Sequence, residues 1–164
     1  MPGVRENGGQ YSHGSSWFVD ALAKLAGEAA DAGNMAAAAR LSARAFETWC
    51  AISPLTKFDT PEAADFYGLP PHQQTADIYE GPGYEGRGGW SWYTGSAARM
   101  MSAAYALLGI SIVKGELTLR RDSFAPKGPL VLKSVTWRGK TYEASPLLAG
   151  PPAKAGAPTR AAGD

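Results

Sequence analysis

Thr94-Gly95-Ser96 combine two hydroxyls and a glycine at the point where a helical pattern begins. The first backbone N–H groups of a helix have no partner within the helix and carry a partial positive charge. Glycine lets an anion approach those groups closely, and Arg87 in the preceding glycine-rich run would add a full positive charge. The segment therefore predicts a phosphate or oxyanion site. The alternative is an ordinary Ser/Thr helix cap.

A second cluster gathers polar side chains in residues 5–13, just before the first expected helix. Its members are Arg5, Glu6, Asn7, Gln10, Tyr11, Ser12 and His13. Carboxylates and amides suit sugar hydroxyls, which need both donors and acceptors, and an imidazole can donate to an anion. The cluster therefore predicts contacts to a sugar and to an anion, with a solvated polar segment as the alternative.

Aromatic residues follow the glycine-rich run at Trp90, Trp92 and Tyr93. Indole rings stack on the apolar faces of sugars, and their N–H donates to hydroxyls. In an extended Trp-Ser-Trp both indoles face one side, so one ring would bind ligand and the other would pack on the helical core. The pattern leaves open which indole does which, and packing of both is the alternative. His72 is interpreted as a loop histidine.

Apolar residues at helical spacing predict the elements that position these groups. One helix is expected over 16–31, capped by Ser15 or Ser16, and a second over 35–51 after the Gly33-Asn34 turn. Helices joined by so short a turn form an αα-hairpin. Thr60-Pro61 predicts a short helix over 61–66, and a third strong helix runs from Thr94 to a stop at Gly109. The first 14 residues lack periodicity and are expected to be a loop.

The remaining segments divide the chain further. Residues 53–93 are rich in Pro, Gly and Tyr, and this aromatic content predicts an ordered, site-forming loop. Alternation over 116–120 and 130–137, with a turn at 138–140 into 141–143, predicts an antiparallel hairpin with one neighbouring strand. The fold class is therefore mainly α with a small C-terminal antiparallel β portion. Its parts are 1–110 (helices and site loops), 111–145 (strands) and 146–164 (a disordered Ala/Pro/Gly tail).

The composition excludes several classes of function. A net charge of +1 provides no basic excess for binding nucleic acid. The single cysteine, Cys50, excludes an internal disulfide, and with two histidines it offers no basis for a structural zinc site. We interpret Cys50 as a small buried helix residue and expect no metal. The sequence shows no apolar run near the ~20 residues of a membrane span and no signal peptide, so a cytoplasmic protein is expected.

Three stretches resemble a known family. VRENGGQYSHGSSWFVDALAKLA (4–26), TADIYEGPGYEGRGGWSWYTGSAARM (75–100) and LLGI (107–110) are similar to the C-terminal part of the catalytic domain of glycoside hydrolase family ninety-four. That family holds inverting cellobiose and chitobiose phosphorylases and the phosphorylase-like domain of cyclic β-1,2-glucan synthases. The longer loop and the spelling of the motifs look nearer to the synthase branch. The resemblance covers residues 3–143.

The resemblance implies part of an (α/α)₆ barrel followed by the start of a β-sandwich cap. It implies that His13, Thr94 and Gly95 bind phosphate and that Arg5 and Glu6 line sugar subsites. The side-chain chemistry adds Gln10 and Trp92 to the sugar site. The family's reaction is displacement at the anomeric carbon by phosphate with inversion, while a carboxylic acid protonates the departing oxygen. The implied partners are a β-linked glucan or oligosaccharide and inorganic phosphate as co-substrate, with no other cofactor, no nucleic acid and no membrane span.

The chain also departs from the family pattern. The family's general-acid aspartate lies in a Trp-Asn-Asp type motif upstream of the His13 segment, and this chain contains no such motif. The upstream arginine of the phosphate site and most of the barrel helices are also missing, so no residue is assigned as catalytic. Residues 69–72 are Leu-Pro-Pro-His where many members carry a Glu-Pro-Tyr type sequence, which alters the expected local sugar contacts.

We therefore expect a fragment of an inverting β-glucan phosphorylase or cyclic β-1,2-glucan synthase type enzyme that carries part of the phosphate and sugar subsites. The missing N-terminal part of that enzyme would be a further partner. One alternative is a catalytically inactive carbohydrate- or partner-binding remnant. Another is a pseudogene product without function.

Overall fold

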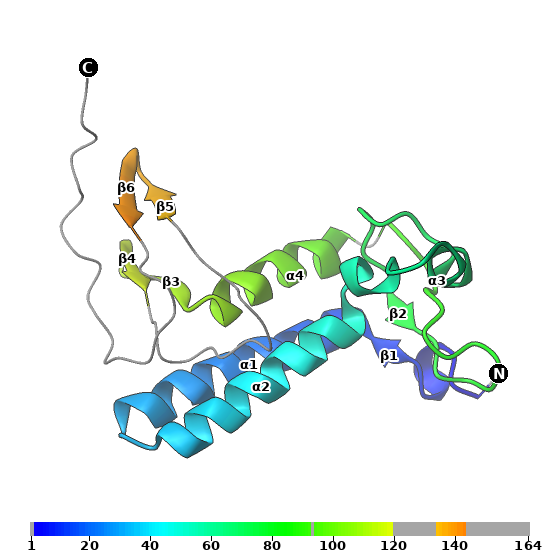
Figure 1. Ribbon diagram of the computed structural model, residues 1–164, viewed down its shortest axis with the longest axis horizontal. Helices are drawn as coiled ribbons and strands as arrows, with labels where there is room; N and C mark the ends of the chain where they lie inside the picture. Colours follow the sequence, from blue (N-terminus) through cyan, green and yellow to red (C-terminus); the bar gives the residue numbers. More distant parts are fainter. Residues whose placement is uncertain (1, 93, 120–133, 144–164) are drawn as a thin grey trace. The chain divides into compact units, whose positions relative to one another are not determined.

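The computed structural model describes residues 2–92, 94–119 and 134–143. The protein is mainly α-helical, with short antiparallel two-stranded sheets (Figure 1), as the sequence predicted. Its elements in chain order are the 3₁₀ helix η1 (Arg5–Asn7), β1 (Gln10–Tyr11), α1 (Ser12–Asp31), α2 (Met35–Ile52), the 3₁₀ helix η2 (Pro54–Lys57), α3 (Pro61–Tyr67), β2 (Asp77–Ile78), α4 (Thr94–Leu107), β3 (Ile110–Val113), β4 (Glu116–Leu119), β5 (Ser134–Trp137) and β6 (Lys140–Glu143).

The elements belong to two units. Residues 1–21 and 44–104 form the first, here named the site unit, and residues 22–43 and 105–164 form the second, named the hairpin unit. The long helices α1, α2 and α4 each run from one unit into the other. No described helix is both long enough and apolar enough to cross a membrane.

Helix α1 begins at Ser12, so the expectation of a loop over the first 14 residues was wrong. The reason is a long-range pairing: Gln10 and Tyr11 pair antiparallel with Ile78 and Asp77. The Ser12 N–H then donates to the Ala76 carbonyl at 2.9 Å, and the chain passes directly from strand into helix. Ser15 and Ser16 lie inside the helix and are not its N-caps, and the Ser16 hydroxyl donates to the His13 carbonyl at 2.7 Å.

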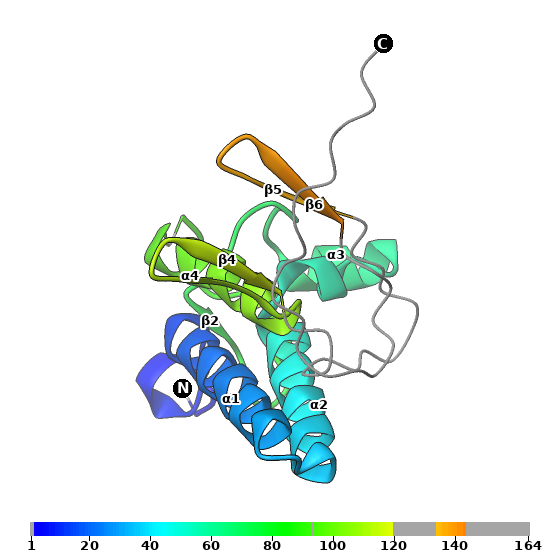
Figure 2. The same cartoon turned by 90° about the vertical axis from the view of Figure 1, so that its left-hand side faces the viewer.

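The αα-hairpin over α1 and α2 is confirmed (Figure 2). Gly33 takes a left-handed φ of 76°, which ends α1, and the Asn34 side-chain oxygen accepts from the Ala37 N–H at 3.1 Å to cap α2. In the hairpin unit, the second half of α1 and the first half of α2 bury small and apolar side chains. These are Leu22, Ala26, Ala30 and Ala38.

The segment over 53–93 is held by hydrogen bonds and aromatic packing within the site unit. Thr60 caps α3 by accepting from the Ala63 N–H at 3.2 Å, and Pro61 opens that helix, as expected. Tyr67 at the end of α3 is fully buried, lies edge-on to Phe58, and accepts from the Gly88 N–H at 3.0 Å through its carbonyl. These contacts agree with the prediction of an ordered loop. Tyr93 lies outside the described residues.

The strands of the hairpin unit form two separate hairpins in the part of the chain that the structure describes. The predicted turn at 138–139 is present, but Lys140 already belongs to β6 rather than to the turn. Residues 116–119 pair with a strand that the sequence analysis missed, β3. Both loops have two residues with positive φ, Lys114-Gly115 and Arg138-Gly139, as two-residue hairpin loops require. Residues 120, 130–133 and the tail from 146 lie outside the described residues.

Candidate functional site

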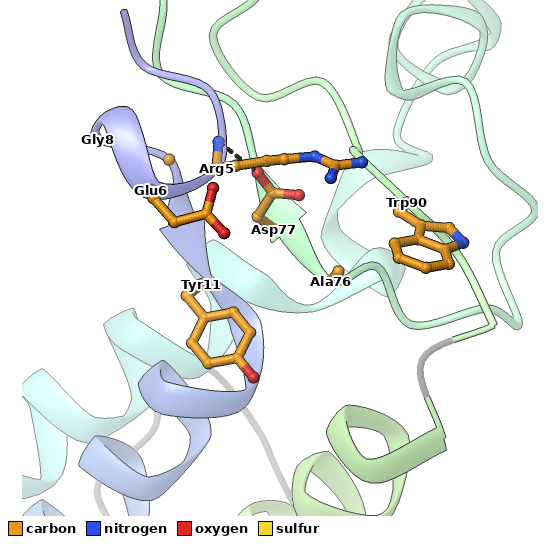
Figure 3. A pocket seen from close by; sticks show the side chains of 8 residues that line it. Arg5, Glu6, Gly8, Tyr11, Ala76, Asp77 and Trp90 are labelled. Carbon is orange, nitrogen blue, oxygen red and sulfur yellow. Dashed lines mark hydrogen bonds between the residues drawn. The ribbon is translucent and has the colours of Figure 1, made fainter.

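A cavity of about 520 Å³ opens in the site unit beside the 3₁₀ turn η1 (Figure 3). It is lined by Arg5, Glu6, Gly8, Gly9, Tyr11, Ala76, Asp77 and Trp90. The lining comes from the N-terminal turn, from both strands of the β1–β2 pair, and from the end of the glycine-rich run. Two carboxylates, a guanidinium, a phenol and an indole therefore share one hollow, and this mixture can hydrogen-bond sugar hydroxyls and stack on a sugar ring.

The buried carboxylate of Asp77 lines this cavity and holds the N-terminal turn in place. Its side chain is only 4% exposed, and its carboxylate Oδ2 accepts from the Arg5 backbone N–H at 2.9 Å. Glycines permit the close approach: a Cβ at Gly9 would lie 2.9 Å from Oδ2, and one at Gly89 would collide with Oδ1. Arg5 takes a left-handed φ of 51°, which is unfavourable for a residue with a side chain. The buried carboxylate thus holds Arg5 in a strained conformation.

Arg5 and Trp90 form one wall of the cavity. In Figure 3 the Arg5 side chain extends above the Asp77 carboxylate toward Trp90, and its guanidinium carbon lies 5.8 Å from the centre of that ring. This distance is within the range of a cation–π contact. Trp90 is 62% exposed, so the indole retains free surface on which a ligand can stack.

Two of the predicted sugar-site residues do not line the cavity. Gln10 lies in β1 opposite Ile78, and Trp92 is 76% exposed with a left-handed φ of 65°. Both indoles of the Trp-Ser-Trp segment are exposed, so the expectation that one of them packs into the core was wrong. The extended conformation assumed for that expectation fails because the left-handed turn at Trp92 interrupts it. The roles of Gln10 and Trp92 stay predictions.

The predicted anion-binding residues meet at the ends of two helices. His13 lies in the first turn of α1, and Gly95 lies in the first turn of α4. A Cβ built on Gly95 would lie 3.2 Å from Cε1 and 3.5 Å from Nδ1 of the His13 ring. The structure therefore brings the His13 and Gly95 segments together, and their binding of phosphate stays a prediction. Thr94 is the first residue of α4, and its side chain lies outside the described atoms.

The surroundings of this junction suit a negative charge. The N-terminal turns of α1 and α4 each present backbone N–H groups that have no partner within the helix. Two serine hydroxyls, of Ser12 and Ser96, are fully buried and have no hydrogen-bond partner among the described atoms. Tyr11 connects the two sites, because it lines the cavity and its ring centre lies 6.2 Å from that of His13.

The other titratable groups lie elsewhere. His72 is exposed in a turn and does not line the cavity. Cys50 lies half-buried on α2, and burial raises the pKa of its thiol while the charge of Lys57 opposes that shift. Within the described ranges, no three His, Cys, Asp or Glu side chains are grouped so that they could hold a metal ion.

The sequence did not assign three of the cavity residues to the sugar site. These are Tyr11, Asp77 and Trp90. Tyr11 belongs to the polar cluster over 5–13 and Trp90 to the aromatic group after the glycine-rich run, but only the fold shows that both line the cavity. Asp77 carried one usable signal, a carboxylate between the apolar residues Ala76 and Ile78 in a stretch with strand-like character. A charged residue in such a position needs a partner, and here the partner is a backbone N–H 72 residues away.

Comparison with known proteins identifies the family of this chain. Residues 1–109 match the model of the glycosyl hydrolase 94 superfamily, catalytic domain, and the chain belongs to that family. It is 35% identical over 145 residues to the cyclic beta-(1,2)-glucan synthase NdvB of Rhizobium meliloti. That alignment covers 88% of this chain and 5% of the synthase, so the chain spans about a twentieth of the length of that relative.

Proposed function

We propose that this chain supplies phosphate- and sugar-binding residues to an inverting β-glucan phosphorylase or cyclic β-1,2-glucan synthase type enzyme. His13, Thr94 and Gly95 hold inorganic phosphate, and Arg5, Glu6, Gln10 and Trp92 contact the glucan. To the sugar site we add Trp90 as a stacking surface, because it lines the cavity. The helices α1, α2 and α4 belong to an (α/α)₆ barrel, and the strands after Ile110 belong to the start of a β-sandwich cap.

One observation carries the proposal. The His13 ring lies within 3.5 Å of the position that a Gly95 Cβ would occupy, although the two residues stand far apart in the sequence. An imidazole and two helix N-termini at one point form an anion-binding arrangement. Tyr11 places this arrangement next to the cavity that holds the carboxylates and the indole. A phosphate at the junction would thus lie beside a sugar in the cavity.

The reaction proposed for the enzyme is displacement of a glycosidic oxygen by phosphate. A phosphate oxygen forms a bond to the anomeric carbon as the bond to the departing oxygen breaks, and a carboxylic acid gives that oxygen its proton. The residues of this chain hold the phosphate in line and offset its charge. Arg5 and Glu6 orient the sugar from the other side. None of them is assigned as the proton donor.

Phosphate binding is tested on the 164-residue chain by NMR of its histidine side chains. The two histidines give two imidazole Cε1–H signals, which His13→Ala and His72→Ala assign. Inorganic phosphate at constant ionic strength is expected to shift the His13 signal in a saturable manner and to leave the His72 signal in place. Equal responses of the two signals, or none, would contradict the phosphate site.

Sugar binding is tested separately with β-1,2-linked gluco-oligosaccharides. We expect saturable quenching of tryptophan fluorescence in the parent chain, weakened about tenfold or more by Trp90→Ala, because stacking surface is lost. Glycan binding without any phosphate response would favour the inactive carbohydrate-binding remnant over the phosphorylase-type enzyme. Absence of both would refute the proposed function.

A further inference from the structure

An ion pair joins the two helices that carry the anion-site residues. Asp20 of α1 and Arg99 of α4 are in direct contact, although 79 residues separate them in the sequence. Their side chains are 25% and 34% exposed. The other two ion pairs found among the described residues, Lys24–Glu28 and Arg44–Glu47, are far more exposed and each lies within one helix. Asp20–Arg99 thus differs from a surface pair of little effect.

Helical spacing places this pair directly below the anion junction. On α1, Trp17 and Asp20 follow His13 by four and seven residues, so all three lie along one face. On α4, Arg99 follows Gly95 by four residues, one turn further along the same helix. The ion pair therefore fixes the two helices against each other within about two turns of the point where His13 meets Gly95.

Trp17 connects the ion pair to the imidazole. Its ring lies edge-on to the His13 ring at 5.7 Å and 80°, and the Arg99 guanidinium carbon lies 5.7 Å from the indole centre. Trp17 is 61% exposed, so burial alone does not determine where the indole lies. The Arg99 cation over the ring supplies the missing restraint. Contacts thus run from Asp20 through Arg99 and Trp17 to His13.

The Asp20–Arg99 ion pair is poorly suited to a purely stabilising role. Asp20 Oδ1 and Arg99 Nε are buried and have no partner among the described atoms. Partly buried charges with unsatisfied atoms recover little of their desolvation cost, and replacing both charges of such a pair by well-packed apolar groups is often neutral for stability. The ion pair matters more for the geometry of the junction than for stability. The His13 ring approaches Gly95 so closely that a small shift of either helix alters the junction.

We propose that Asp20 and Arg99 are positioning residues that hold the His13 ring against Gly95 and thereby set the affinity of the junction for inorganic phosphate. The proposal rests on the proposed function, since it concerns the same anion site. Asp20 acts through Arg99, and Arg99 acts through Trp17. Neither needs to touch the phosphate.

The test compares Asp20→Asn, Arg99→Gln and Arg99→Lys in the 164-residue chain. Two readouts are taken: the nuclear Overhauser effect between the His13 Cε1 proton and the Gly95 α-protons, and the phosphate dissociation constant from the His13 signal. Asp20→Asn and Arg99→Gln should abolish the Overhauser effect and weaken phosphate binding about 10- to 100-fold, as small misplacements of binding groups do. Arg99→Lys, which keeps the charge, should weaken phosphate binding less than Arg99→Gln does. Glu47→Gln, in an exposed pair, is the matched control and should change neither readout.

The outcomes separate the two proposals. If the parent chain shows the Overhauser effect but no phosphate response, the proposed phosphate binding is wrong. The Overhauser effect in the variants still tests whether Asp20 and Arg99 position the His13 ring. Variants that keep both the Overhauser effect and the affinity within twofold would overturn the positioning role. Weaker phosphate binding with an unchanged Overhauser effect would overturn it too, since the effect would then come from the charge of Arg99 at a distance. Thermal melts establish that each variant is folded, and a variant that does not fold is replaced by Trp17→Leu, which removes the aromatic ring that Arg99 contacts.

Discussion

Asp77 shows how one buried side chain determines the geometry of a whole cavity. Its carboxylate is 4% exposed and holds the Arg5 N–H, while Arg5 extends its guanidinium to Trp90. Glu6 and Arg5 belong to the same 3₁₀ turn, so the Asp77 contact positions both. The residue types in the Arg5–His13 cluster were apparent from the sequence. The partner that orders them was not, because 72 residues separate Asp77 from Arg5.

The first prediction concerns the hydrogen bond of Asp77. Asp77→Ala leaves the strained Arg5 amide without its acceptor, and a hydrogen bond to a charged group contributes about 1.5–3 kcal/mol. We expect the free energy of unfolding in urea to fall by about 2 kcal/mol and the affinity for β-1,2-linked gluco-oligosaccharides to fall with it. Asp65→Ala, at an exposed position on α3, is the control and should change stability by less than about 0.5 kcal/mol. An Asp77→Ala variant as stable as the parent would show that Arg5 is held by other contacts.

At the scale of elements, the sequence predicted the boundaries that local signals determine. It did not predict those that depend on pairing between distant segments. The helix starts after Gly33-Asn34 and at Thr60-Pro61 and the stop at Gly109 were correct, because the Asn34 and Thr60 caps and the left-handed Gly109 each act within one turn of their helix. The start of α1 was wrong because it depends on the β1–β2 pairing across the long 53–93 segment. Strand β3 was missed because Ile110–Val113 follows a helix directly and shows no clear alternation, so only its pairing with β4 reveals it.

Helix α3 provides the prediction at this scale, through Tyr67. Burial raises the pKa of the Tyr67 phenol from its ordinary value of 10.0 to about 12, and its hydroxyl has no partner among the described atoms. The folded state therefore prefers the neutral phenol. The resulting stability is complete below pH 10 and is lost as the pH rises from 10 to about 12. Over that range, the loss due to Tyr67 alone is about 2 kcal/mol.

Tyr67→Phe isolates that contribution. At pH 8 the variant should be as stable as the parent or slightly more so, because it removes a buried hydroxyl without a partner. Between pH 10 and 12 it should lose less stability than the parent, as measured by chemical denaturation at each pH. Tyr84→Phe, at an exposed tyrosine, serves as the control and should follow the parent curve. If the free energies of unfolding of the parent and Tyr67→Phe fall in parallel with pH, Tyr67 ionises as readily in the folded state as in the unfolded state.

At the scale of the whole molecule, the near-neutral charge means that the proposed anion binding depends on a few local groups. The net charge is +1, so no broad positive field draws phosphate to the chain. Attraction has to come from the helix N-termini and His13, where a few groups point at one place. The residue types of this site were predictable from the sequence, and their convergence rested on the family resemblance. The Asp20–Arg99 pair was not predictable, since neither residue stands in a pattern that distinguishes it from an ordinary surface charge.

The last prediction is that the 164-residue chain binds phosphate and β-glucan but does not turn them over. Binding to the folded state alone raises the free energy of unfolding by about 2.7 kcal/mol at a hundredfold excess over the dissociation constant, so phosphate should raise the melting temperature. Chloride at the same ionic strength is the control, and His13→Ala should remove the phosphate effect. No release of glucose 1-phosphate from β-1,2- or β-1,4-linked oligosaccharides is expected, because no residue of the chain is assigned as the acid. Turnover that persists through purification and is abolished by Glu6→Gln would show instead that this chain carries its own proton donor.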